Sequence, residues 1–133
     1  MKNEEQKQLE NFHFKILKGE KKEDGKIEKS YQAGVALLRE GQQNYMIHIY
    51  ILQHNEFFLV PHKVEPGRYY IMTRRPTKNP NKKAKYEWNI VGHGRANSRQ
   101  ACIELNFDLF SEPLYMNIFP MEKCVSHELK LSA

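Results

Sequence analysis

Residues 74–85 form the segment with the clearest capacity for binding chemistry. The segment holds six lysines and arginines among twelve residues and no acidic residue. Two prolines keep it extended and disfavour a helix. Phosphate groups pair with such cations, so the segment predicts a site for a polyanion. The residues expected to contact a phosphate backbone are Arg74, Arg75, Lys78, Lys82, Lys83 and Lys85.

Aromatic residues flank this basic segment on both sides. Tyr69 and Tyr70 precede it, and Tyr86 and Trp88 follow it. Bases stack on exposed rings with roughly 1–3 kcal/mol each, which suits a single-stranded nucleic acid. Side chains alternate along a strand, so Tyr69 and Tyr70 cannot face the same side. We take Tyr70, Tyr86 and Trp88 as the stacking candidates.

A second segment, 92–99, contains two glycines, two arginines and a serine. Its backbone N–H groups and guanidinium groups are suited to holding a phosphate if the segment is a turn. No helix is predicted after it, which excludes a phosphate-binding loop of the Walker type. Arg95 and Arg99 would extend the basic track, as would Arg68 on its other side. A plain turn is the alternative.

The positive charge is unevenly distributed along the chain. The net charge is +5, but residues 61–100 hold ten basic and two acidic side chains, whereas residues 101–133 hold two basic and five acidic ones. A local field attracts a polyanion more effectively than a diffuse one. Two alternatives remain open: a solvated loop that guards a sheet edge, and a surface for an acidic protein.

Residues with catalytic or metal-binding potential are dispersed. Cys124 and His127 form a C-x-x-H motif, but a second half of a zinc site is missing from the sequence. Cys102 is predicted to be an inert thiol on an outward strand face, although a Cys–His dyad is conceivable. Asp108 and Glu112 flank a turn and are weak candidates for a carboxylate pair. We therefore predict no catalytic residue, no metal, no cofactor and no enzyme activity.

The elements that must position these residues are short strands. Apolar residues alternate with polar ones in many short runs, separated by turn residues at close spacing. This pattern predicts a single antiparallel β domain of seven to eight short strands, a barrel or a sandwich, with an oligonucleotide-binding-like (OB-like) barrel favoured. A hairpin or a mobile loop fits the charged stretch around Asp24-Gly25 equally well. The expected strands cover residues 12–17, 31–39, 45–51, 57–60, 68–73, 86–91, 101–107 and 114–119.

The chain of 133 residues is expected to form one domain. Residues 1–11 are predicted to be a flexible charged arm, residues 12–120 the β domain and residues 121–133 a C-terminal tail. No apolar run approaches the ~20 residues of a membrane-spanning helix, and the charged N-terminus lacks a signal peptide pattern. The sequence therefore predicts a cytoplasmic protein without a membrane partner. It does not determine the oligomeric state.

From Arg68 to Phe119 the spacing of short motifs resembles that of small β-rich proteins from bacterial plasmids and other mobile elements. The matching motifs are Tyr69-Tyr70-Ile71, Glu87-Trp88, Ile103-Glu104-Leu105 and the segment 113–119. The resemblance implies a bacterial mobile-element setting. It implies no site residue.

These observations favour a non-enzymatic protein that binds single-stranded DNA or RNA with low sequence specificity. The basic loop and the neighbouring rings would form the interface, because the sequence holds no candidate for a base-reading helix. The alternative is a protein-interaction module, an adaptor or inhibitor, that places the same loop against an acidic protein surface.

Overall fold

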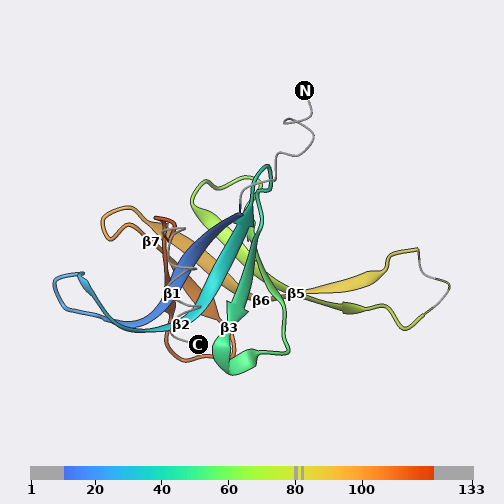
Figure 1. Cartoon of the computed structure of the whole chain (residues 1–133), viewed down its shortest axis with the longest axis horizontal. Helices are drawn as coiled ribbons and strands as arrows, with labels where there is room; N and C mark the ends of the chain where they lie inside the picture. The colour runs from blue at the N-terminus through green and yellow to red at the C-terminus, as the bar shows by residue number, and fades with distance from the viewer. Residues whose placement is uncertain (1–10, 80, 82, 122–133) are drawn as a thin grey trace, which may run out of the picture.

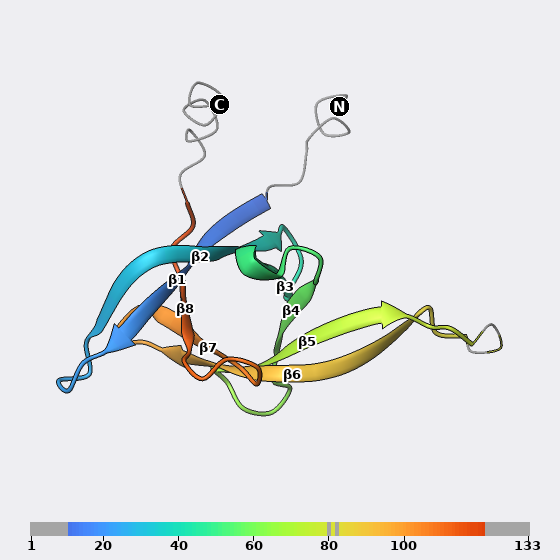
Figure 2. The same cartoon turned by 90° about the horizontal axis from the view of Figure 1, so that it is seen from below.

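Eight antiparallel strands form a closed barrel in the computed structural model (Figures 1 and 2). The structure describes residues 11–121 except Pro80 and Lys82. Each strand pairs with its neighbours in the sequence, and β8 pairs with β1 to close the barrel. The strands are β1 (Asn11–Lys21), β2 (Ile27–Arg39), β3 (Tyr45–Ile49), β4 (Phe57–Pro61), β5 (Arg68–Pro76), β6 (Tyr86–Asn97), β7 (Cys102–Phe107) and β8 (Leu114–Asn117), with a 3-10 turn η1 (Tyr50–Leu52) after β3.

The antiparallel β barrel predicted from the sequence is confirmed. Its type differs from the favoured OB-like one, because the eight strands follow one another in an up-and-down order. An OB-fold has five strands in a Greek-key order. The expected flexible arm before residue 11, the tail after residue 121, and the residues Lys82, Cys124 and His127 lie outside the described residues.

Period-two alternation accounts for the barrel interior. Phe14 and Ile16 on β1 point inward, as do Ile103 and Leu105 on β7, and each is at most 6% exposed. The interior of an eight-stranded barrel is just wide enough for side chains to fill. The remaining core members are Ala36, Ile47, Ile49, Phe57, Leu59, Ile71, Phe107, Leu114 and Met116.

Two hairpins are longer than the barrel wall requires. The β1–β2 hairpin and the β5–β6 hairpin extend on opposite sides of the barrel (Figures 1 and 2). The sequence left a hairpin and a mobile loop open for the charged stretch near residue 24, and the structure shows the hairpin. Its turn is closed by the Lys22 N–H donating to the Lys26 carbonyl at 2.7 Å, and Gly25 takes a φ of 86°. That left-handed conformation favours glycine.

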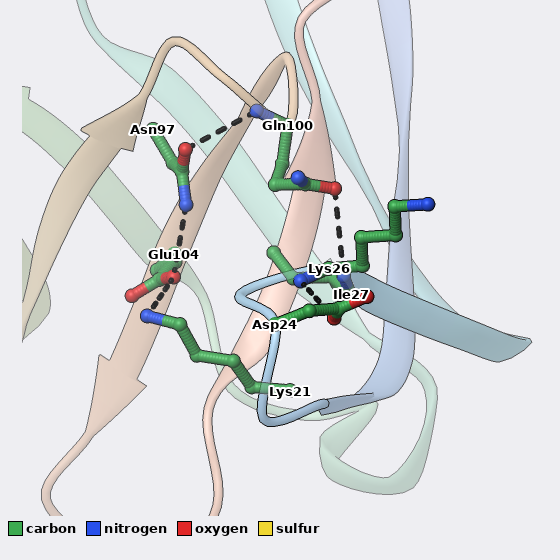
Figure 3. A network of polar contacts seen from close by, with 7 residues as sticks. All are labelled: Lys21, Asp24, Lys26, Ile27, Asn97, Gln100 and Glu104. Atoms are coloured by element: carbon green, nitrogen blue, oxygen red, sulfur yellow. Dashed lines mark hydrogen bonds and ion pairs between the residues drawn. The ribbon is translucent and has the colours of Figure 1, made fainter.

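The β1–β2 hairpin lies against the outside of the barrel, and we call residues 19–29 the docked hairpin. Lys29 Nζ donates to Asn117 Oδ1 at 2.7 Å, and Lys21 Nζ lies 3.6 Å from Glu104 Oε1 (Figure 3 shows the second contact). The Ile27 N–H donates to the Gln100 side-chain oxygen. These contacts tie the hairpin to β7, β8 and the β6–β7 turn.

A second cluster of buried side chains lies beneath the docked hairpin. Tyr115 and Cys102 sit on the outer faces of β8 and β7, yet each is only 1% exposed. A Cβ on Gly19 would lie 3.1 Å from the Tyr115 ring and 2.9 Å from the Glu28 carbonyl oxygen. Glycine at position 19 therefore permits the close approach. Cys102 faces outward as predicted, but it is covered.

Three strands are shorter than the sequence predicted. β3 ends at Ile49, so Ile51 lies in η1 and is 81% exposed instead of facing the core. β8 ends at Asn117 and leaves Phe119 69% exposed. Ala101, the first residue of the expected strand 101–107, lies instead in the turn before β7 with a φ of 51°.

The predicted turn over residues 92–99 was wrong, because β6 continues through Asn97. The two glycines belong to the barrel wall. A Cβ on Gly92 would collide with the Asn106 carbonyl, and one on Gly94 would lie 3.1 Å from the Leu59 side chain. Since this part of β6 pairs with both β5 and β7, its backbone forms sheet pairs instead of a phosphate-binding loop.

Candidate nucleic-acid interface

The outward face of the β5–β6 ribbon carries cations and rings from the barrel wall to the last strand pair. β5 extends to Pro76, so Arg74 and Arg75 lie on a strand and the connecting loop begins at Thr77, later than predicted. A bulge between Ile71 and Met72 shifts the register but leaves one continuous outward face. We call this outward side of β5 and β6 the basic-aromatic face. Its cross-strand pairs are Arg68–Arg95, Tyr70–His93, Met72–Ile90, Arg74–Trp88 and Pro76–Tyr86.

Arg74 is the centre of a ring cluster on this face. Its guanidinium carbon lies 4.2 Å from the centroid of the Tyr86 ring, 5.0 Å from that of Phe58 and 5.7 Å from that of Trp88. Phe58 and Trp88 also meet edge to face, with centroids 5.3 Å apart. Glu56 Oε2 accepts from Arg74 Nη2 at 3.3 Å. Arg74 therefore holds the rings in place, and its charge is paired with that of Glu56.

Tyr86 and Trp88 retain surface that a base can reach. Tyr86 is 38% exposed and Trp88 is 45% exposed. Trp88 packs against Phe58 and Arg74, and Tyr86 packs against Arg74. This packing limits the motion of both rings, which lowers the entropy cost of stacking a base on them. Both stacking candidates are exposed beside the basic segment, and their role in binding stays a prediction.

The cations near the hairpin end are less engaged. Arg75 Nε lies 3.2 Å from Glu87 Oε2, whereas Lys78, Lys83 and Lys85 are exposed and form no ion pair with any residue that the structure describes. The Thr77 N–H donates to the Lys85 carbonyl at 2.9 Å and continues the ribbon past its last strand residue. Three free ammonium groups therefore lie beyond the ring cluster.

At the other end of the same face is a groove of about 460 Å³. Tyr70 lies between two imidazoles, with its ring centroid 5.1 Å from that of His62 and 5.8 Å from that of His93. We call this the histidine groove. Its polar and charged lining comes from the β4–β5 turn and from β5, β6 and β7: His62, Arg68, Tyr70, His93, Arg95, Glu104 and Asn106.

Two arginines face each other across the strands in this groove. Arg68 and Arg95 are Cα partners on β5 and β6. Arg68 Nε is paired with Glu65 Oε2 at 2.9 Å, while Arg95 has no side-chain partner among the residues described. Like charges directly opposite each other destabilise a sheet. Two carboxylates partly offset this repulsion: Glu65 beside Arg68, and Glu104, the Cα partner of Arg95 on β7.

The structure brings together most of the predicted site residues. Tyr70 faces outward and Tyr69 packs against the core, as alternation requires. Arg99 lies apart, in the β6–β7 turn at the opposite end of the barrel from the β5–β6 loop. The sequence reading missed His62 and His93, which lie 31 positions apart. Only the pairing of β4, β5 and β6 places them beside Tyr70, and periodicity alone gives no sign of it.

Among residues 11–79, 81 and 83–121, no group of three or more histidine, cysteine, aspartate or glutamate side chains is arranged to hold a metal ion. In the same part of the chain, no helix has the length and apolar character needed to cross a lipid bilayer. Burial raises the pKa of the Cys102 thiol, and Glu104 adds to the rise. A buried thiol with a raised pKa is a poor nucleophile.

No family model, curated protein or solved structure matches this chain. The resemblance to proteins of mobile elements gains no support from these comparisons and stays a prediction. Functional inference therefore depends on the geometry of the basic-aromatic face.

Proposed function

We propose that this protein is a non-enzymatic binder of single-stranded nucleic acid with low sequence specificity. The observation that carries the proposal is the basic-aromatic face, where exposed rings and cations share one side of a projecting ribbon. Phosphates would pair with Lys78, Lys83 and Lys85, and bases would stack on Tyr86 and Trp88. Since these contacts use the sugar-phosphate backbone and ring faces, they discriminate weakly between sequences.

The ordered ring cluster is what favours a single strand. Base faces are accessible in a single strand and covered by stacking in a duplex. A two-stranded ribbon can also enter a duplex groove, and an acidic protein surface would use the lysines but not the rings. Both alternatives are outcomes of the experiment below.

The test measures affinity for single-stranded DNA, single-stranded RNA, duplex DNA and an acidic polypeptide over a range of salt concentrations. We expect the single strands to bind most tightly, with affinity falling steeply as salt rises. Trp88 is the sole tryptophan, so its fluorescence reports stacking directly and should be quenched. Tighter binding to the duplex or the polypeptide, or affinity that is independent of salt, would contradict the proposal.

A matched pair of tyrosine variants separates ring stacking from charge. Tyr86→Leu removes a ring from the basic-aromatic face, whereas Tyr31→Leu removes a ring that is 59% exposed on β2, with Lys18 Nζ 5.7 Å from its centroid. We expect the first to weaken single-strand binding by roughly fivefold to a hundredfold and the second to leave it unchanged. Equal effects would place the ligand elsewhere.

A further inference from the structure

We propose that the histidine groove binds the terminal phosphate monoester of a nucleic-acid strand. This inference rests on the proposed function and adds a strand end as the anchored part of the ligand. The lysines and rings of the projecting ribbon would hold the nucleotides that follow.

Arg95 brings an unpaired guanidinium into the groove beside Arg68. Arg68 and Arg95 face each other, and the guanidinium of Arg95 has no partner within the described part of the chain. Guanidinium groups bind phosphate oxygens in a bidentate manner. An internal phosphodiester carries one charge, whereas a phosphate monoester carries about −1.5 to −2. Arg68 is paired with Glu65, and Glu104 faces Arg95 from β7, so the unpaired Arg95 guanidinium is the group offered to the second charge of the monoester.

Further hydrogen-bond donors line the histidine groove beside the arginines. Asn106 lies beside His93 across β6 and β7, and the Tyr70 ring lies between His93 and His62. His62 Nδ1 accepts the N–H groups of Val64 and Glu65 at 3.2 and 3.0 Å, so its proton is on Nε2. Imidazole N–H, phenol and amide groups can each donate to the additional free oxygen that a terminal phosphate has.

Carboxylates border the histidine groove at the end of the basic-aromatic face. Glu65 borders it in the β4–β5 turn, and Glu104 borders it on β7. The turn is held across the end of the ribbon, because the Ala96 N–H donates to the Gly67 carbonyl and the His62 N–H to the Arg68 carbonyl, both at 2.8 Å. Beyond the arginine pair along the ribbon, a phosphate backbone would meet the Glu65 carboxylate of the turn. A strand that ends there would not.

The spacing along the ribbon matches a short strand. Arg68 and Arg74 are six residues apart on β5, about 20 Å at roughly 3.3 Å per residue. About six nucleotides at the 3.4 Å duplex spacing cover this distance, and fewer do so when the strand is extended. A strand anchored in the histidine groove therefore reaches the ring cluster around Trp88.

The experiment compares oligonucleotides of about eight nucleotides, long enough to span the ribbon. They share one sequence and an internal fluorescent label, and carry a 5′ phosphate, a 3′ phosphate or hydroxyls at both ends. We expect one phosphorylated end to bind about tenfold more tightly than the hydroxyl form. Arg95→Gln should abolish this preference, whereas Arg99→Gln, an equal change of charge outside the groove, should preserve it.

Adenosine 5′-monophosphate serves as a competitor that carries the same phosphate chemistry without a strand. If it binds as tightly as the phosphorylated oligonucleotide, the ligand is a free nucleotide and the strand-end proposal is overturned. If all three oligonucleotides bind equally, the groove proposal fails while the proposed function stands. If none of them binds, the proposed function itself fails.

Discussion

The two long hairpins of this barrel are built alike and used differently. The docked hairpin makes contacts to β7, β8 and the β6–β7 turn, and it buries Tyr115 and Cys102. The β5–β6 hairpin extends from the other side of the barrel (Figure 2) and keeps its rings on an outward face. The first adds to the stability of the fold, and the second offers surface for a partner.

Charge follows the same division. In the docked hairpin Lys22 Nζ lies 2.9 Å from Glu28 and 3.6 Å from Glu20, and the hydrogen bond with Glu28 raises the pKa of Lys22. In the segment 74–85 there is no acidic residue at all. Neutralised charge within a hairpin contributes little to an external field, whereas unpaired charge attracts polyanions. The β5–β6 hairpin therefore carries an excess of positive charge that the docked hairpin does not.

The largest expected effect concerns stability. Tyr115→Ala should lower the free energy of unfolding by about 3–5 kcal/mol, because it empties a buried aromatic site beneath the docked hairpin. Trp88→Ala on the projecting ribbon should cost about 1 kcal/mol or less, since the ring is half exposed. Urea denaturation followed by circular dichroism measures both. Equal losses would remove the distinction between the hairpins.

The second prediction concerns binding. Replacing Lys78, Lys83 and Lys85 together by Gln should reduce the slope of log affinity against log salt by about 2, which is about 0.7 for each phosphate contact of a single strand. At about 0.1 M salt this corresponds to a loss of roughly a hundredfold. Fluorescence anisotropy at several salt concentrations measures it.

The matched control for the binding prediction changes the same charge on the other hairpin. Replacing Lys21, Lys22 and Lys26 by Gln should leave the slope unchanged. A similar drop with this variant would indicate that binding responds to the net charge of the molecule and not to the ribbon.

The third prediction tests why the docked hairpin can approach the barrel. Gly19→Ala places a methyl group 2.9 Å from the Glu28 carbonyl oxygen and 3.1 Å from the Tyr115 ring. Such overpacking costs about 1–3 kcal/mol of stability. Hydrogen exchange should show faster exchange across the docked hairpin, and no change across β5 and β6. Unchanged exchange at the docked hairpin would refute the packing argument.

Local sequence patterns predicted the features that depend only on neighbouring residues, such as strand alternation and the charge of a segment. Phe14 and Ile16 are two positions apart, as are Ile103 and Leu105. The strand period of two therefore places both members of each pair on one side of the strand, which is the core side. The charge of segment 74–85 and its flanking rings are likewise visible without coordinates. Arg99 was included because segment 92–99 was predicted to be a phosphate-holding turn, whereas the fold extends β6 to Asn97 and places Arg99 in the β6–β7 turn, at the opposite end of β6 from the β5–β6 loop.

Longer-range packing produced the features that the sequence did not predict. Gly92 and Gly94 resemble turn residues, but they are required because strands β6 and β7 and the Leu59 side chain approach closely. His62 meets Tyr70 only through the β4–β5 pairing. The burial of Cys102 depends on a hairpin more than seventy positions earlier, so no local pattern can reveal it.

The smallest expected effect concerns the pH dependence of docking. Burial raises the pKa of the Cys102 thiol above its ordinary value of 9.0, so the docked state holds the thiol proton more tightly than an open state does. The resulting stabilisation is fully present below pH 9.0 and is lost as the pH rises through the raised pKa. Burial raises the pKa of Tyr115 as well, from an ordinary value of 10.0, so both groups weaken docking in alkali.

Cys102→Ala isolates the thiol contribution to this pH dependence. The variant removes the thiol while leaving Tyr115 in place, so its unfolding free energy should decline less steeply above pH 9.0 than that of the unmodified chain. As a counterpart on the other hairpin, Asn89→Cys introduces a thiol at an exposed position of β6 and should leave the pH profile unchanged. The three profiles, measured by urea denaturation, compare the chain with the covered Cys102 thiol, without that thiol, and with an exposed thiol added to it. If the Cys102→Ala profile coincides with that of the unmodified chain, the thiol under the docked hairpin does not contribute, and Tyr115 alone would account for any weakening in alkali.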